Sequence, residues 1–194
     1  MQDKKKLFKE IQKAKAVFDE VLLNKEYKYI YKDIITGKIK SFEMKCMANN
    51  FLHLTGVKTR LTGSTFYSAL DKKKLSFRDI DYKKNGTTKL KLDMFKRLKL
   101  LFTSAVQVSL HDDFFTLRLE VDILVHRSKR EFKDIILGLK RDKSGEHFVP
   151  ASLLKQKPNK VGTNFSPVLQ ILQKDRNEKE YSRIVYQSKS YKGA

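Results

Sequence analysis

The sequence predicts an α+β fold in which N-terminal helices are followed by a mostly antiparallel β-sheet. Apolar residues near the N-terminus recur every three or four positions, which is the spacing of one buried helix face. In the second half of the chain, apolar and polar residues alternate, which is the period of a half-buried strand. Because helices come first and strands later, the order of elements favours α+β over a parallel α/β sheet.

The first predicted element is an amphipathic helix of about five turns. Lysines fall outside its apolar face, which comprises Leu7, Phe8, Ile11, Ala14, Val17, Phe18, Val21 and Leu22. A chain of 194 residues is long enough for one core and too short for two comfortable domains. We therefore expect residues 1–26 to form an N-terminal amphipathic helix and residues 27–190 to form a single α+β domain.

The next segments predict a hairpin and then short helices. Residues 27–31 and 38–44 are strand-like and flank a turn that contains Gly37, which is typical of a hairpin. A short helix is expected over residues 51–55, where a preceding asparagine can cap it. Another short helix is expected to begin at Ser64. The middle of the chain is therefore predicted to be helical in short pieces.

A longer basic helix is predicted from Thr88, which can cap it, through an apolar stripe that ends at Phe102. Residues 115–125 alternate in polarity and predict a strand, with which residues 104–110 are expected to pair. Two further hairpins are predicted. In the first, strand-like residues 132–140 and 147–154 flank a polar turn; in the second, residues 168–173 and 181–187 do so.

Charge points to a polyanionic partner. The chain carries 42 Lys and Arg residues against 22 Asp and Glu residues, a net charge of +20, and such an excess attracts polyanions and speeds their encounter. A hydrophobic fraction of 40% with 13 Phe and 8 Tyr is typical of a folded core and excludes a disordered basic tail. Nucleic acid is the leading expected partner; a lysine-rich surface that serves only solubility is the alternative.

The sequence also indicates a compartment. Cys46 is the single cysteine, so one chain can form neither an internal disulfide nor a cysteine-based zinc site. No apolar run approaches the ~20 residues that cross a bilayer, and the first residues lead into an amphipathic helix, which is not the pattern of a signal peptide. We therefore expect a cytoplasmic protein without a membrane partner.

The most distinctive motif is NFLHLTG at residues 50–56, in which a histidine lies between apolar neighbours, followed by a hydroxyl residue and a glycine. Together with residues 42–47 before it and residues 65–67 after it, this motif resembles a phage-associated branch of the barnase, EndoU, colicin and RelE-like nuclease family, the BECR fold. The resemblance extends over roughly residues 28–188. It implies N-terminal helices and a curved antiparallel sheet of about four strands whose concave face holds RNA.

The resemblance implies a metal-independent endoribonuclease-like protein of a phage or mobile element, with no cofactor. In that chemistry a base takes the proton of the ribose 2′-hydroxyl, an acid protonates the leaving 5′-oxygen, and cations stabilise the phosphorane. His53 occupies the motif position, and an imidazole can serve as acid or base near neutral pH. The alternative is that His53 packs against the core beside Leu52 and Leu54. The expected catalytic residues are His53, Lys140, Ser152 and His147.

Further residues are expected to contact the nucleic acid. Lysines crowd the loop after residue 154 and can grip phosphate oxygens, hydroxyl residues can orient the phosphate, and a tyrosine can stack on a base. The expected contact residues are Arg141, Lys155, Lys157, Lys160, Thr163 and Tyr181, with Tyr186 as a second candidate for stacking.

Two rival hypotheses remain open on the sequence. Asp33 with Glu43 and Lys45 faintly resembles the carboxylate-carboxylate-lysine set of a magnesium-dependent DNA nuclease. A non-enzymatic rival is an inhibitor or adaptor, of an anti-defence type, that binds nucleic acid without cutting it or blocks a nucleic-acid-binding protein of the host. Turnover separates an enzyme from a binder, and chelation separates the two nuclease hypotheses.

Overall fold

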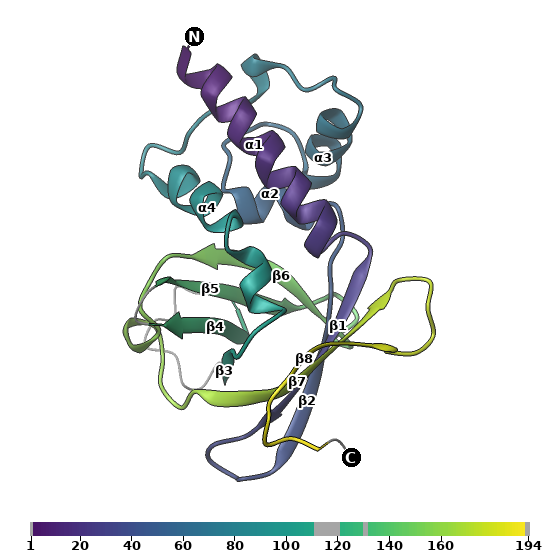
Figure 1. The fold of residues 1–194 in the computed structure, drawn as a ribbon. Coiled ribbons are helices and arrows are strands. Elements are labelled where there is room, and N and C mark those ends of the chain that lie inside the picture. The colour runs from purple at the N-terminus through teal and green to yellow at the C-terminus, as the bar shows by residue number, and fades with distance from the viewer. Residues whose placement is uncertain (1, 111–120, 130–131, 193–194) are drawn as a thin grey trace.

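The computed structural model describes residues 2–110, 121–129 and 132–192. In this part of the chain the helices gather at one end and the strands at the other, so that the N-terminal and C-terminal ends lie far apart (Figure 1). The predicted α+β class, with helices first and a mostly antiparallel sheet later, is confirmed.

The helices differ in detail from the prediction. The chain forms α1 (Gln2–Val21), α2 (Asn50–Thr55), α3 (Gly63–Asp71), α4 (Thr87–Phe95) and the 3₁₀ turns η1 (Phe77–Asp79), η2 (Leu98–Leu101) and η4 (Pro158–Lys160). The single long basic helix expected from Thr88 is wrong: α4 ends at Phe95 and η2 follows, because Arg97, at φ −116° and ψ −1°, departs from helical geometry. None of these helices combines the length and the apolar character needed to cross a bilayer.

The break between α4 and η2 has a packing reason. Leu98 and Leu101 in η2 are fully buried, and η2 contacts strands of the sheet as well as α1. Thr88 is not the cap either, since Gly86 precedes the helix at φ 75° and the Thr88 hydroxyl donates to the Gly56 carbonyl at 2.7 Å.

In the described residues eight strands form one curved sheet, which agrees with the eight strand segments predicted from the pattern of residues and exceeds the four or so that the resemblance implied. They are β1 (Lys25–Lys32), β2 (Ile39–Lys45), β3 (Gln107–Leu110), β4 (Ile123–Lys129), β5 (Phe132–Arg141), β6 (Phe148–Leu154), β7 (Ser166–Asp175) and β8 (Arg183–Gln187). Their order is β1-β2-β6-β5-β4-β3-β7-β8, and β1 also pairs with β7, so the pairing closes on itself. The β2–β6 contact is parallel and consists of one pair, Met44 with Phe148.

The three predicted hairpins are present as β1–β2, β5–β6 and β7–β8. β3 pairs antiparallel with β4, as expected for residues 104–110 and their partner strand. The prediction of a strand over residues 115–125 falls largely on residues 111–120, which lie outside the described residues.

One apolar cluster joins the helices to the sheet. Leu7, Ile11 and Phe18 of α1 belong to it, together with Tyr29 of β1 and Phe51 of α2. The buried Tyr29 ring is stabilised further by a hydrogen bond from its hydroxyl to the Leu101 carbonyl at 3.2 Å. Residues of α1 and of the sheet thus contribute to the same cluster. The division into an N-terminal helix over residues 1–26 and a domain over residues 27–190 stays a prediction.

We predict that Phe51→Ala lowers the free energy of unfolding by about 3–5 kcal/mol, because it leaves a cavity in a packed core. Phe51 is fully buried, and its ring centroid lies 5.0–6.0 Å from four aromatic rings, those of Phe18, Phe66, Tyr67 and Phe95. Urea unfolding measures the change. Leu90→Ala on α4, where the side chain is 48% exposed, is the control and should change stability by less than about 0.5 kcal/mol. Equal losses in the two variants would contradict the packing argument.

Candidate active site

A groove runs between the helices and the β5–β6 hairpin. Its volume is about 880 Å³, and its walls come from α2, the N-terminus of α3, the β5–β6 hairpin and the turns near β2 and β7. Among the described residues its lining includes five Lys or Arg side chains and two carboxylates: Lys45, Lys140, Arg141, Lys143 and Arg176, with Asp142 and Glu146. His53 and His147 line it as well. We call this surface the His53 groove; its excess of positive charge suits a phosphate chain.

Helix α2 presents His53 to this groove. Phe51, Leu54 and Thr55 face the core, so His53 falls on the opposite, exposed side of the six-residue helix. Gly56 ends the helix in a left-handed conformation at φ 62°. The alternative that His53 packs against the core is therefore wrong.

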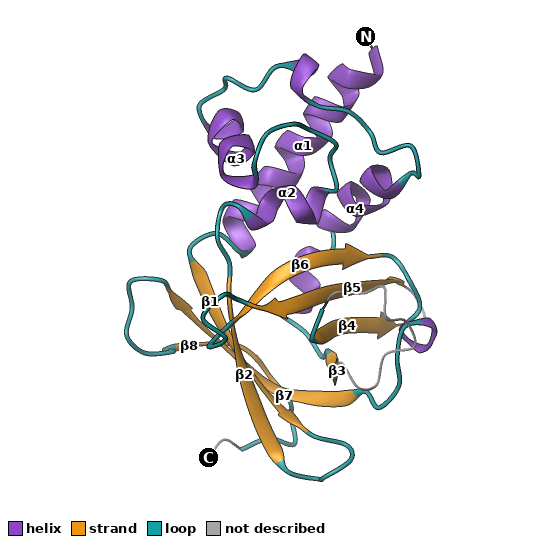
Figure 2. Cartoon of the chain, turned by 180° about the vertical axis from the view of Figure 1, so that it is seen from behind, coloured by secondary structure: helices purple, strands orange, loops and turns teal. Residues whose placement is uncertain are grey.

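Helix α2 is fixed to strand β6 by a buried amide. Asn50 is 8% exposed; its Nδ2 donates to the Pro150 carbonyl at 3.2 Å, and its Oδ1 accepts from the Met47 backbone N–H at 2.8 Å. Figure 2 shows α2 at the boundary between the helices and β6. The position of His53 relative to the sheet therefore depends on this contact.

The N-terminus of α3 forms another part of the wall. Thr62 caps this helix, and Gly63 and Ser64 follow it into the groove. A side chain at Gly63 would place Cβ 2.4 Å from the Asn49 carbonyl oxygen, so glycine permits this close approach. The positive end of a helix dipole adds to the attraction for anions here.

Electrostatics favour a neutral imidazole at His53. Partial burial lowers its pKa below the usual value, and the nearby ammonium groups of Lys140, Lys91 and Lys83 lower it further. Near pH 7 the ring therefore holds a free lone pair, which is the form that can accept a proton.

Lys140 and His147, two further residues of the predicted catalytic set, lie on the opposite wall; their catalytic role stays a prediction. Lys140 is an exposed residue near the end of β5, and His147 is half-buried just before β6. The carboxylates of Glu43 and Glu146 lie 4.0 and 3.9 Å from the two ring nitrogens of His147, and they can form ion pairs with the protonated ring. The structure thus brings His53, Lys140 and His147 into one groove.

Arg141 also lines the groove, and its side chain is held in place. Its Nη1 donates to the Gly145 carbonyl at 2.9 Å, and its guanidinium lies 4.9 Å from the centre of the Phe148 ring. A guanidinium that is already positioned loses little freedom when it binds a phosphate.

Ser152 does not line the groove but lies behind its wall. Its hydroxyl accepts a hydrogen bond at 3.3 Å from the ammonium of Lys91, which also donates to the His53 carbonyl at 2.9 Å. Lys91 was not among the predicted site residues. Burial, with Lys83 nearby, lowers the pKa of Lys91 to about 8. The sequence feature that could have identified Lys91 is its position three residues after Thr88 and four before Phe95, which places it on the buried face of α4.

Five predicted contact residues do not line the groove: Lys155, Lys157, Lys160, Thr163 and Tyr181. Lys155 forms an ion pair with Asp93 at 3.6 Å. The Tyr181 ring is covered by the Lys174 ammonium at 4.9 Å, and burial next to carboxylates raises the pKa of its hydroxyl. Their contact with nucleic acid stays a prediction. Such contact would require the bound nucleic acid to extend beyond the groove.

Three basic residues of the groove were missed: Lys45, Lys143 and Arg176. They come from β2, from the β5–β6 turn and from the residue that follows β7. Lys143 lies in the same predicted hairpin as Lys140 and Arg141, whereas Lys45 and Arg176 reach the groove only through long-range pairing of strands, which no local pattern marks.

The carboxylate-lysine set of the magnesium hypothesis is not assembled. Asp33 lies in the β1–β2 turn, where its carboxylate accepts from the backbone N–H groups of Ile35 and Thr36 and pairs with Lys40. Glu43 pairs with Lys28 of β1, so it lies five residues of extended strand from Asp33, a distance of roughly 17 Å. Asp33 therefore shapes the turn and does not join Glu43 in a site.

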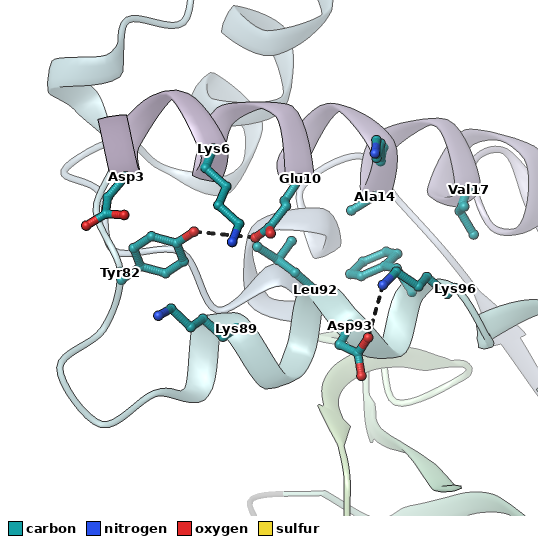
Figure 3. Close-up of a pocket in the computed structure, with 12 residues that line it drawn as sticks. Asp3, Lys6, Glu10, Ala14, Val17, Tyr82, Lys89, Leu92, Asp93 and Lys96 are labelled. Carbon is teal, nitrogen blue, oxygen red and sulfur yellow. Dashed lines mark hydrogen bonds and ion pairs between the residues drawn. The ribbon is translucent and has the colours of Figure 1, made fainter. Parts of the chain in front are cut away.

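A second hollow lies between α1 and α4 (Figure 3). It has a volume of about 280 Å³, an apolar floor that includes Val17 and Leu92, and a rim of both charges. On this rim the Tyr82 hydroxyl donates to Glu10 at 3.4 Å, and Lys96 pairs with Asp93. Because charges of both signs compensate one another here, this hollow lacks the phosphate-attracting character of the His53 groove.

The fold and the groove define the chain as an α+β protein with a basic groove that two histidines line. Residues 10–190 match the family described as phage-Barnase-EndoU-ColicinE5/D-RelE like nuclease 4, and the chain belongs to this family. The predicted resemblance is thereby confirmed, and the matched region includes most of α1. Membership implies a nucleic-acid substrate. No curated protein and no solved structure matches the chain.

We predict that Lys140→Met raises the pKa of His53. The Lys140 ammonium disfavours a second positive charge on the imidazole, so its removal makes protonation easier. An NMR titration of the His53 ring protons measures the change. Lys143→Met is the control from the same hairpin, because Lys143 is not among the charges that lower the pKa of His53. An unchanged pKa in Lys140→Met would contradict this account of the groove.

Proposed function

We propose that this protein is a metal-independent endoribonuclease that cleaves RNA by attack of the ribose 2′-hydroxyl. The observation that carries the proposal is the exposed imidazole of His53 in a basic groove, in a chain of a nuclease family; its lowered pKa favours the neutral form. A neutral imidazole can take the hydroxyl proton directly, and ammonium and guanidinium groups can balance the phosphate charge.

In the proposed mechanism, His53 accepts the proton of the 2′-hydroxyl while the 2′-oxygen attacks phosphorus. Lys140 and Arg141 stabilise the negative charge of the phosphorane. The bond between phosphorus and the 5′-oxygen then breaks, and His147 on the opposite wall gives its proton to that oxygen. The products are a 2′,3′-cyclic phosphate and a free 5′-hydroxyl. Ser152 contributes indirectly, through its hydrogen bond with Lys91.

RNA is the proposed substrate because the nucleophile in this mechanism belongs to the ribose. The histidine pair matches a general base and a general acid on two walls of one groove. DNA lacks the 2′-hydroxyl and could be bound by the same cations but not cut in this way.

We predict that the purified protein cuts a labelled mixed-sequence RNA in EDTA and leaves cyclic phosphate ends. His53→Ala should lower the rate by roughly 10²- to 10⁴-fold, which is the contribution of a general base. DNA of the same sequence is the control and should remain intact. If RNA is retained but not cut, with EDTA or with magnesium, the enzyme hypothesis fails and a non-catalytic binder or inhibitor takes its place.

Binding itself should depend steeply on salt. Each phosphate contact contributes a slope of about −0.7 to the plot of log affinity against log salt for a single strand. We predict that Lys140→Met makes this slope shallower by roughly that amount, measured with an RNA that carries a 2′-deoxy residue at the cleavage position. Lys38→Met in the β1–β2 turn is the control, since Lys38 does not line the groove. An identical slope in both variants would remove Lys140 from the phosphate contacts.

A further inference from the structure

We propose that Lys91 on α4 is a positioning residue that acts through His53 and Ser152, joining the end of α2 to strand β6 behind the groove wall. This inference rests on the proposed function of His53. It adds to that function a residue that touches no substrate and yet fixes the geometry and the charge of the base.

The hydrogen bonds of Lys91 link two walls of the site. Its Nζ donates to the backbone carbonyl of His53 at 2.9 Å and to the hydroxyl of Ser152 at 3.3 Å. The first bond fixes the backbone of the residue that carries the imidazole. The second bond ties that point to β6, the strand that Asn50 contacts through Pro150. Lys91 and Asn50 therefore hold α2 on β6 at two separate points.

The path of the Lys91 stem is fixed by the turn after α2. A Cβ atom at Gly56 would lie 2.9 Å from Cδ of Lys91, so the stem passes directly over this glycine. The same turn is tied to α4 through the hydrogen bond from the Thr88 hydroxyl to the Gly56 carbonyl. The path of the stem thus fixes the position of the ammonium and limits the conformational freedom that a long side chain otherwise keeps.

The two hydrogen-bond acceptors of Lys91 are neutral oxygen atoms, so they do not neutralise its positive charge. This charge therefore acts on His53. The charged groups that face His53 are Lys91 on α4, Lys140 on β5 and Lys83 before α4, and the polar residues Thr62 and Ser64 of α3 line the same groove. Since the pKa of Lys91 is about 8, this side chain is mostly cationic at pH 7 and opposes protonation of the imidazole.

A purely structural role would not require this charge. Burying an ammonium costs desolvation energy, and an apolar side chain of similar length fills the same space without that cost. Methionine resembles the lysine stem in length and flexibility. Lys91→Met therefore keeps the packing on Gly56 and removes only the hydrogen bonds and the charge.

The test compares wild type, Lys91→Met and Lys91→Arg, with Lys89→Met as the control. Lys89 is exposed on the same helix, and its ammonium lies over the Tyr82 ring in the second hollow. We expect the His53 pKa, measured by NMR, to rise in Lys91→Met and to return towards the wild-type value in Lys91→Arg. The acidic limb of the RNA-cleavage pH profile should move to higher pH in Lys91→Met. At pH 8 we expect kcat to fall about 10- to 100-fold from misplacement, with KM little changed.

Either readout can overturn the proposal. A folded Lys91→Met protein with the wild-type His53 pKa and the wild-type pH profile would reduce Lys91 to a packing residue. If Lys91→Met does not fold, Ser152→Ala releases one of the two hydrogen bonds and should lower kcat with KM little changed; a wild-type kcat there would also overturn the proposal. The NMR titration needs no substrate, so it tests Lys91 even if the wild-type protein cuts no RNA, whereas His53→Ala in the cleavage assay tests the proposed function.

Discussion

The contact between helix α2 and strand β6 is the constraint on which the site depends. A helix of six residues is too short to be stable alone, so its position must come from tertiary contacts. The buried rings around Phe51 hold it from the core side, and the Asn50 amide holds it to Pro150 on β6. The opposite face of the same helix is then free to present His53. The packing of this short helix therefore also determines the position of His53 in the site.

The surroundings of the two histidines differ in charge. Around His53 the ammonium groups of Lys91 on α4 and Lys140 on the facing hairpin act on the imidazole, and burial lowers the pKa of both His53 and Lys91. On the hairpin wall two carboxylates lie within 4.0 Å of the His147 ring. In the proposed mechanism the base, His53, therefore has cationic neighbours, and the acid, His147, has anionic ones.

Most of the fold could be predicted because its signals are local. Periodicity marked α1 and the three hairpins, and the β5–β6 hairpin alone brings Lys140 and His147 to one end of the sheet. His53 was found through its motif. Lys91 was missed because it reaches His53 from 38 residues further along the chain. Lys45 of β2 and Arg176 after β7 were missed because the β2–β6 and β1–β7 pairings are long-range. Local patterns carry no information on such contacts.

Net charge is a poor guide to the number of phosphate contacts in this protein. Lysines on several elements are already occupied by carboxylates: Lys15 pairs with Asp19 and Asp71, and Lys174 pairs with the buried Glu26. Lys45 lines the groove, but it too pairs with Glu26, at 3.8 Å, so part of its charge is compensated before any ligand binds. We therefore expect the electrostatic attraction for a phosphate chain to come chiefly from the β5–β6 hairpin and Arg176. In the proposed function the +20 charge speeds encounter, whereas the groove holds the chain of phosphates.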